Sequence, residues 1–419
     1  MTSNPLPGAK LHIETARAKA AQVDDIPATT PLKPVARVGV LGAGTMGGGI
    51  AMNFLTAGIP VTIVETEQAN LDRGVETIRR NYANSVKRGK LSEDEAGRAM
   101  ALLTPSLVFA DLGEADLVIE AVYENMDLKK DIFGRLDKIA KPGAILASNT
   151  SYLDVDEIAA TTKRPDAVLG MHFFSPANVM KLLEVVRGAK TGASELATVM
   201  ALAPRIGKIA VVSGVCPGFI GNRMLTPRQQ QAQALLMEGA AYNDVDDVLL
   251  EFGFPMGPFQ MGDLAGNDVG WHRDPARVET LREALCAVGR FGQKAGKGWY
   301  DYDDNRQRTV SDETLRIVSE FTARQGQLQR TIAKDEIRER LLYPMINEGA
   351  KILDEGMAQR AGDIDTVWLN GYGWPAWTGG PMYWANHEGL ANIVAGLEKY
   401  RLEVAPYLRR KAEAGEIFG

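Results

Sequence analysis

The chain has 419 residues, of which 45% are apolar and 24% charged; this composition excludes a disordered or collagen-like protein and predicts roughly two to four globular domains. Its 47 basic and 53 acidic residues give a formal net charge of −6, which argues against a nucleic-acid-binding protein. The two cysteines, Cys216 and Cys286, are too few for a disulfide framework or a cysteine-rich zinc site, and we expect no metal.

Targeting signals are also not recognisable in the sequence. Residues 1–10 do not resemble a secretory signal, and no stretch approaches the ~20 apolar residues of a membrane span. Residues 416–419 match no peroxisomal or retention tripeptide. We therefore expect a cytoplasmic protein without a membrane span.

The first half of the chain has the pattern of an α/β domain. Residues 1–34 are polar and punctuated by proline, which predicts a linker with one helix over 15–22. Short apolar runs then alternate with amphipathic stretches, which predicts a Rossmann-type dinucleotide-binding domain over 35–213, with helices on both faces of a parallel sheet. The strands are expected at 38–41, 61–64, 117–122 and 144–147. The helices are expected at 47–57, 71–89 and 93–103.

Helical periodicity replaces the strand signals after about residue 212, and the helical region repeats itself. Arg223-Met-Leu-Thr-Pro227 recurs as Arg340-Leu-Leu-Tyr-Pro344, and Gly253-Phe-Pro255 recurs as Gly373-Trp-Pro375. Ordered matches of this kind predict two tandem all-helical domains, a duplicated C-terminal unit over 214–310 and 328–419.

A glycine-rich element directly follows the first predicted strand and opens a helix. In Gly42-Ala-Gly44-Thr-Met-Gly47, the first glycine permits a tight turn, the second lets a pyrophosphate approach the backbone, and the third lets helix and strand pack closely. Glu65 ends the next strand, where an acid accepts the ribose hydroxyls. Because a carboxylate repels a 2′-phosphate, Glu65 favours NAD over NADP.

One histidine and one acid stand out in apolar surroundings. His172 ends an apolar run that reads as a sheet strand, and Glu184 lies inside the apolar run 182–186. A buried carboxylate needs a partner, and a histidine partner gains basicity and a fixed tautomer from it. From the residues alone, a catalytic pair and a structural pair remain equally open. The other histidines, His12, His272 and His387, are expected to be structural or on the surface.

Polar residues at 148–151 and 217–223 lie at the junction of the two predicted regions, a common location for ligand sites. Together with 42–47, 172–176 and Glu184, these motifs resemble the L-3-hydroxyacyl-CoA dehydrogenase family. The linker and the repeated helical region look closest to the dehydrogenase half of peroxisomal-type multifunctional enzymes of fatty-acid β-oxidation.

The resemblance implies NAD-dependent oxidation of (S)-3-hydroxyacyl-CoA to 3-oxoacyl-CoA. It implies that His172 is the general base and Glu184 its partner, and that Ser151 and Asn222 hold the hydroxyl and thioester region of the substrate. The residues implied to border the NAD site are Gly42, Gly44, Met46, Gly47, Glu65, Glu124, Lys129, Ser151 and Lys294.

Two departures from the family pattern are visible. Ser175 stands where many members have asparagine, and the hydratase/isomerase half is not in the sequence, so we expect a dehydrogenase only. The basic stretch 71–89 can supply charge to the phosphates of an acyl-CoA. We expect a monomer, with a separate enoyl-CoA hydratase or thiolase as its partner in the pathway.

Two other functions remain open at the level of the sequence. A dehydrogenase of another hydroxy acid would share the glycine motif and could share the His–Glu pair. A non-catalytic NAD-binding or assembly protein would explain the repeat while leaving His172 incidental.

Overall fold

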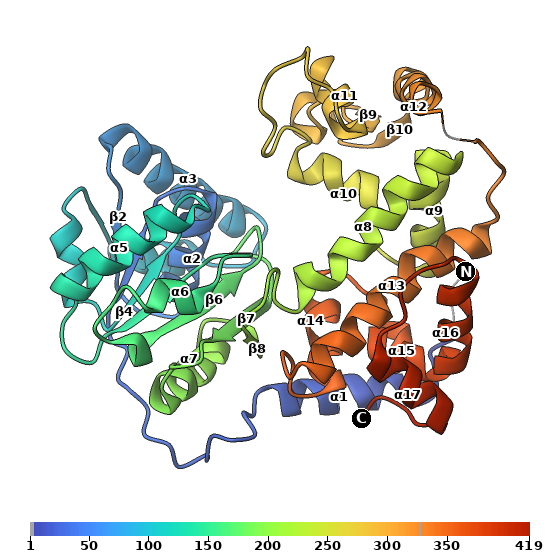
Figure 1. The fold of residues 1–419 in the computed structure, drawn as a ribbon. Helices are drawn as coiled ribbons and strands as arrows, with labels where there is room; N and C mark the ends of the chain where they lie inside the picture. Colours follow the sequence, from blue (N-terminus) through green and yellow to red (C-terminus); the bar gives the residue numbers. More distant parts are fainter. Residues whose placement is uncertain (1–3, 327) are drawn as a thin grey trace.

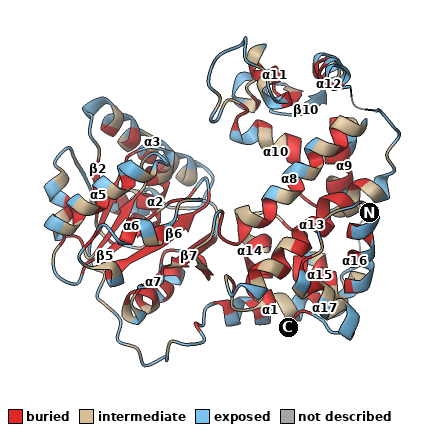
Figure 2. Ribbon diagram, viewed as in Figure 1, coloured by how far each residue is buried: buried red, intermediate tan, exposed pale blue. Residues whose placement is uncertain are grey.

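The structure is a computed structural model that describes residues 4–326 and 328–419. Figure 1 shows two lobes, an α/β lobe built around one sheet and a helical lobe that contains the C-terminal half of the chain. Buried residues run along the sheet in the first lobe and along the central helices in the second (Figure 2). Within the described part of the chain, no helix is both long and apolar enough to cross a membrane.

Eight strands form the sheet in the order β3-β2-β1-β4-β5-β6-β7-β8. Their bounds are β1 Val38–Leu41, β2 Val61–Val64, β3 Leu103–Ser106, β4 Leu117–Glu120, β5 Ile145–Ser148, β6 Val168–Phe173, β7 Leu182–Arg187 and β8 Ile209–Gly214. Neighbouring strands are parallel except for β6 and β7, which pair antiparallel. β1 and β2 have the predicted bounds, β4 ends two residues early, and β5 is shifted by one.

The antiparallel β7 differs from the purely parallel sheet expected from the sequence. The connection from β6 covers only residues 174–181, too few for the crossover that a parallel pair needs. The sequence also gave no sign of β3, which contains Pro105 and has no buried residue. It lies at the edge of the sheet, where proline is tolerated.

Helices cover both faces of the sheet, as predicted. The helices on one face are α2 (Thr45–Thr56), α3 (Gln68–Lys87), α4 (Glu93–Ala101) and α7 (Ala193–Arg205). The helices on the other face are α5 (Met126–Ile139) and α6 (Val155–Ala159). Each set of helices closes its own apolar core, so the sheet is a rigid platform for the loops at its carboxyl edge.

The helical lobe contains helices α8 to α17 around one continuous apolar core. Their bounds are α8 Gly221–Glu238, α9 Tyr242–Phe252, α10 Pro258–Ala265, α11 Leu281–Ala287, α12 Asp312–Arg324, α13 Lys334–Asp354, α14 Ala361–Gly371, α15 Pro381–Glu388, α16 Leu390–Lys399 and α17 Pro406–Ala414. The lobe is not all-helical as expected, because β9 (Tyr300–Tyr302) and β10 (Arg308–Val310) form a hairpin. The polar turn between them, rich in aspartate and asparagine, favours such a reversal.

The N-terminal helix α1 (Ala9–Ala20) begins well before the predicted residue 15 and is docked on the helical lobe. Ala16 is buried against α14, so close that a Cβ added to Gly362 would lie 3.0 Å from its methyl group. His12 Nε2 lies 2.7 Å from the buried carboxylate of Asp365, so His12 is a structural residue. After α1, the chain runs as an extended segment back to β1 (Figure 1).

Candidate functional site

The glycine loop connects β1 to α2 at the carboxyl edge of the sheet. Gly42 has a φ of 101°, which favours glycine, and a Cβ on Gly47 would lie 1.9 Å from the Gly42 carbonyl oxygen. A Cβ on Gly44 would meet nothing within 4 Å, and no described side chain caps the start of α2. The free N–H groups of this helix terminus therefore face open space and can bind a phosphate.

Glu65 follows β2 and lies beside this loop. Its Oε2 accepts a hydrogen bond from the Ala43 N–H at 3.1 Å, and its Oε1 accepts from the Thr66 N–H at 2.8 Å. Met46, in the first turn of α2, is half-buried next to the same loop. A phosphate-binding helix start with a carboxylate beside it is the arrangement that a dinucleotide requires.

His172 and Glu184 face each other across the antiparallel pair β6 and β7, directly opposite in register. His172 Nδ1 and Glu184 Oε2 are 2.7 Å apart, and both side chains are buried. The rings of Phe174 and Phe219 flank the imidazole at centroid distances of 4.4 and 5.6 Å. No hydrogen bond to Nε2 is found among the described residues, so this nitrogen is free to exchange a proton with a bound molecule.

The second oxygen of Glu184 is held by the start of α8. Oε1 accepts from the N–H groups of Ile220 at 3.2 Å and of Gly221 at 2.9 Å. The positive end of the helix dipole therefore stabilises the carboxylate, which in turn fixes the imidazole tautomer. The antiparallel strand β7, which the sequence did not predict, is the element that brings this acid to the histidine.

A second buried acid, Glu120, is the last residue of β4. Lys129 Nζ donates to both oxygens of Glu120 at 2.7 and 2.9 Å and lies 3.4 Å from a Glu124 oxygen; its side chain has no exposed surface. Glu124 Oε1 accepts from the Ser151 N–H at 2.7 Å. Lys129 thus holds the loops after β4 and β5 together. Sequence reasoning missed Glu120, although an acid inside an apolar run carried the same signal as Glu184.

The predicted polar groups after β5 and at the start of α8 also belong to this region. Asn149 Oδ1 accepts from the Phe173 N–H at 2.8 Å, which ties the loop of Ser151 to the end of the histidine strand. Asn222 is in the first turn of α8, next to the residue that binds Glu184. Its Oδ1 accepts from the hydroxyl of Tyr372 at 2.8 Å. The sequence gave no reason to place Tyr372 at this site.

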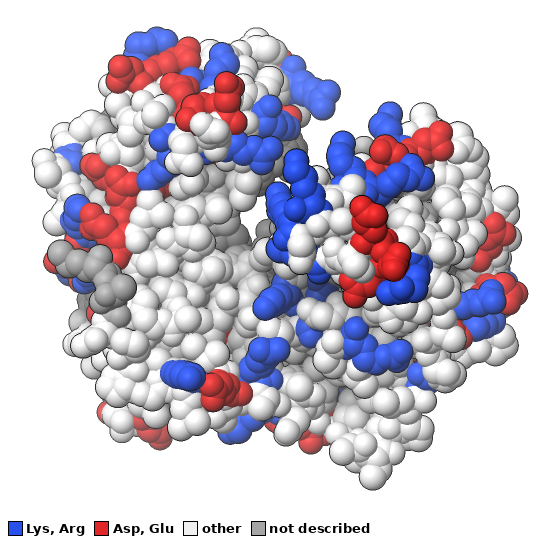
Figure 3. All heavy atoms as spheres, turned by 180° about the vertical axis from the view of Figure 1, so that it is seen from behind, with Lys and Arg blue, Asp and Glu red and all other residues white. Residues whose placement is uncertain are grey.

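Lys294 is not brought together with the other predicted residues. It lies in the 3₁₀ turn Gln293–Ala295 of the helical lobe, is more than half exposed, and pairs with Asp268 at 2.5 Å. Seen from behind, the molecule has a hollow between its lobes, and Lys and Arg side chains gather along the border of this hollow (Figure 3).

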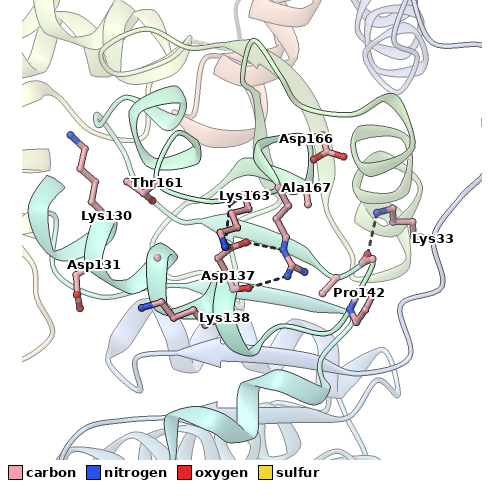
Figure 4. A pocket seen from close by; sticks show the side chains of 14 residues that line it. Lys33, Lys130, Asp131, Asp137, Lys138, Pro142, Thr161, Lys163, Asp166 and Ala167 are labelled. Carbon is pink, nitrogen blue, oxygen red and sulfur yellow. Dashed lines mark hydrogen bonds and ion pairs between the residues drawn. The ribbon is translucent and has the colours of Figure 1, made fainter.

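A cavity with a volume of about 780 Å³ lies away from this site. Lys33, Lys130, Lys138 and Lys163 surround it (Figure 4). Its lining includes the segments that precede β5 and β6, so it lies at the opposite edge of the sheet from the glycine loop. Two half-buried polar side chains in its lining, Arg164 and Asp137, are paired with each other.

Lys208 holds the loop between the two strands of the His–Glu pair. Its Nζ donates to the carbonyl oxygens of Ala177 at 2.5 Å and Met180 at 2.6 Å, with no carboxylate partner among the described residues. Burial lowers the pKa of Lys208 to about 8, from an ordinary value of 10.5. Sequence reasoning did not select this residue either.

We predict a pH-dependent stability that originates from Lys208. Between about pH 8 and pH 10.5 the unfolded chain carries a proton that the folded chain has released, so the contribution of Lys208 to the free energy of unfolding rises with pH. Lys208→Met should remove this rise in urea unfolding measured across the window. Exposed Lys181 provides the control, since Lys181→Met should leave the pH dependence unchanged. An unaltered profile in Lys208→Met would contradict the assignment.

Comparison with known protein families identifies two matching family models. The model described as "3-hydroxyacyl-CoA dehydrogenase, NAD binding domain" matches residues 37–216. The model described as "3-hydroxyacyl-CoA dehydrogenase, C-terminal domain" matches residues 218–302. The junction between the two matches falls where β8 ends and α8 begins.

Relatives of known function cover most of the chain. The human peroxisomal bifunctional enzyme is 44% identical over an alignment of 421 positions, which covers 92% of this chain and 57% of that protein. A peroxisomal fatty acid beta-oxidation multifunctional protein of Arabidopsis thaliana is 37% identical over 380 residues, 88% of this chain and 53% of that protein. The chain thus spans about half the length of these relatives. Their names place them in peroxisomes, in contrast to the cytoplasmic location expected from the sequence.

Solved structures with the same fold include one from Caenorhabditis elegans, the dehydrogenase part of multifunctional enzyme 1. It is 30% identical with a TM-score of 0.68, and the match covers 97% of each chain. The 3-hydroxybutyryl-CoA dehydrogenase of Escherichia coli is 29% identical with a TM-score of 0.77, and the match covers 91% of this chain and 99% of that one.

Proposed function

We propose that this chain, which belongs to the 3-hydroxyacyl-CoA dehydrogenase family, oxidises the 3-hydroxyl group of an (S)-3-hydroxyacyl-CoA with NAD as its cofactor. The observation that carries the proposal is the buried pair His172–Glu184, placed at the same sheet edge as the glycine loop. The pair holds Nδ1 and leaves Nε2 available to a bound substrate, which favours a catalytic role over a purely structural one.

Each residue of the site has a separate role in the proposed reaction. Nε2 of His172 accepts the hydroxyl proton of the substrate, while Glu184 stabilises the imidazolium that forms, because it holds Nδ1 at 2.7 Å. Ser151 and Asn222 bind the hydroxyl and thioester region of the substrate. NAD, when bound, accepts the hydride from C3. The N–H groups around Gly44 and the carboxylate of Glu65 fit its pyrophosphate and its ribose.

The pathway that we propose is fatty-acid β-oxidation. One assay distinguishes this function from a dehydrogenase of another hydroxy acid and from a non-catalytic NAD-binding or assembly protein. NADH formation is measured with an (S)-3-hydroxyacyl-CoA and with the corresponding free hydroxy acid. Turnover of the thioester alone supports the proposal, turnover of the free acid alone indicates another hydroxy-acid dehydrogenase, and no turnover of either indicates a binding or assembly protein. A separate enoyl-CoA hydratase would supply the substrate, and a thiolase would consume the product.

We further propose that 214–310 and 328–419 are two copies of one helical domain, following the NAD-binding domain at 35–213. In support, a buried aspartate binds the start of a Gly-Pro helix in each copy. Asp246 accepts from the Phe259 N–H at 2.9 Å at the start of α10. Asp365 accepts from the Met382 N–H at 2.7 Å at the start of α15. The second copy has Glu339 where the first has Asn222, so it lacks the substrate amide.

The two proposed copies share one core, and α8 of the first packs along α13 of the second. Because each copy covers the apolar face of the other within one chain, no second chain is needed to cover it. We therefore expect light scattering of the intact chain to give the mass of a monomer. Removal of residues 328–419 would expose apolar surface and should give dimers or aggregates. A dimer of the intact chain would contradict this expectation.

Substitution of His172 should abolish most of the turnover. His172→Gln keeps a group that can hydrogen-bond to Glu184 but has no basic nitrogen, so kcat should fall by a factor on the order of 10² to 10⁴. NAD binding, measured by titration calorimetry, should be unchanged. His387 is exposed and serves as the control, since His387→Gln should have normal kcat. A folded His172→Gln protein with normal turnover would remove His172 from the mechanism.

Glu65 should determine the cofactor preference. Because its carboxylate would accept the ribose hydroxyls and repel a 2′-phosphate, the wild type should have a much higher kcat/KM with NAD than with NADP. Glu65→Ala should reduce this ratio by at least about tenfold. The neighbouring exposed acid gives a matched control, as Glu67→Ala should keep the preference. Equal kcat/KM values for both cofactors in the wild type would refute the role of Glu65.

A further inference from the structure

Tyr372 reaches from the far end of the chain to the candidate site. It follows the last turn of α14, and its hydroxyl donates to Asn222 Oδ1 at 2.8 Å. Its ring lies over the start of α8, so close that a Cβ added to Gly221 would come within 2.5 Å of Oη. The ring also meets Phe174 edge-on at 5.5 Å, and Phe174 flanks the imidazole of His172. One side chain of the last helical region thus contacts three parts of the site.

The position of the Tyr372 ring is fixed by its surroundings. It stacks on Trp368 with a centroid distance of 4.5 Å, and the guanidinium of Arg228 lies 5.4 Å from the same Trp368 ring. Trp368 and Arg228 are both fully buried, so neither can move without disturbing the core. The hydroxyl is therefore presented to Asn222 from a rigid support.

The Tyr372 hydroxyl keeps its proton throughout the physiological range. Burial raises the pKa of Tyr372 well above its ordinary value, and the nearby carboxylate of Glu184 raises the pKa further. A protonated phenol donates one hydrogen bond, and here the acceptor is the amide oxygen of Asn222.

The hydroxyl is not needed for the fold of this turn. In the alignment of the two helical repeats, Gly373 corresponds to Gly253, so Tyr372 corresponds to Phe252. Phe252 packs with its ring alone, against Trp374 and Trp377 at centroid distances of 5.7 and 5.6 Å. A phenyl ring is therefore enough to pack the equivalent turn. The hydroxyl of Tyr372 is an extra group that contacts the site.

We propose that Tyr372 is a positioning residue that fixes the amide of Asn222, so that its Nδ2 donor faces the oxygen of the substrate. Oδ1 accepts the phenolic proton, and a flipped amide would leave this proton without the acceptor that it has here. In the observed orientation the –NH₂ group remains for the ligand. The inference rests on the proposed function, in which Asn222 binds the substrate. The second helical region lacks a substrate amide of its own. Through Tyr372, it would instead orient the substrate amide of the first region.

The test is a double-mutant cycle on the full chain, with Tyr372→Phe and Asn222→Ala. Tyr372→Phe removes one oxygen and keeps the ring, so kcat/KM for an (S)-3-hydroxyacyl-CoA should fall about three- to tenfold, while the Kd for NAD stays unchanged. In the Asn222→Ala background the same substitution should have no further effect, because its target is gone. Tyr383→Phe is the matched control, since that hydroxyl donates to the Pro7 carbonyl oxygen, away from the site.

Two kinetic results would overturn the proposal: a wild-type kcat/KM in Tyr372→Phe, or an equal loss in the wild-type and Asn222→Ala backgrounds. A purely structural role would produce that equal loss together with a lowered Tm. If the wild type oxidises no acyl-CoA, the proposed function fails instead. A crystal structure of Tyr372→Phe then tests the positioning alone: a rotated Asn222 amide supports it, and an unchanged amide overturns it.

Discussion

The carboxylate of Glu184 is the group on which the arrangement of the molecule depends. It is completely buried, and an unpaired charge in such a place would cost several kcal/mol. Its partners come from different parts of the chain: His172 from the neighbouring strand and the N–H groups of residues 220 and 221 from the start of α8. The charge therefore joins the sheet to the helical lobe. Displacement of α8 relative to β7 would remove two of the three partners of this carboxylate and leave only His172.

A buried carboxylate that binds N–H groups at the start of a helix occurs twice more in the helical lobe. Asp246 and Asp365 are buried acids that each bind the first N–H groups of a following helix. Burial raises the pKa of both carboxyls, that of Asp246 to about 6. The third partner differs: the Tyr300 hydroxyl binds Asp246, whereas His12 of the N-terminal helix binds Asp365. Helix α1 thus supplies a partner for a buried carboxylate of the helical lobe.

The sequence alone predicted those features that depend on local pattern. The strands β1 and β2 could be placed to the residue because glycine and proline bound short apolar runs, and Glu184 could be found because a carboxylate inside such a run needs a partner. The Rossmann-type sheet domain followed by a helical region, the NAD cofactor and the family were predicted as well. The antiparallel β7 was not, because the direction of a strand depends on the length of the loop before it rather than on its own residues. The contact of Tyr372 with the site could not be predicted, since its partner Asn222 is 150 residues away and only the packing of α8 and α14 brings them together.

The docking of α1 also determines how the two lobes can move. The chain passes between the lobes at two places, once after α1 and once between β8 and α8. Beyond the first crossing the segment is fastened to the α/β lobe, because the Lys33 N–H donates to Thr198 Oγ1 and Ser194 Oγ donates to the Pro31 carbonyl oxygen. The lobes also touch directly, because the Gly214 N–H donates to the Met357 carbonyl oxygen at 2.8 Å and Leu182 of β7 belongs to the apolar core of the helical lobe. Two chain crossings together with these contacts restrict how far the hollow between the lobes can open.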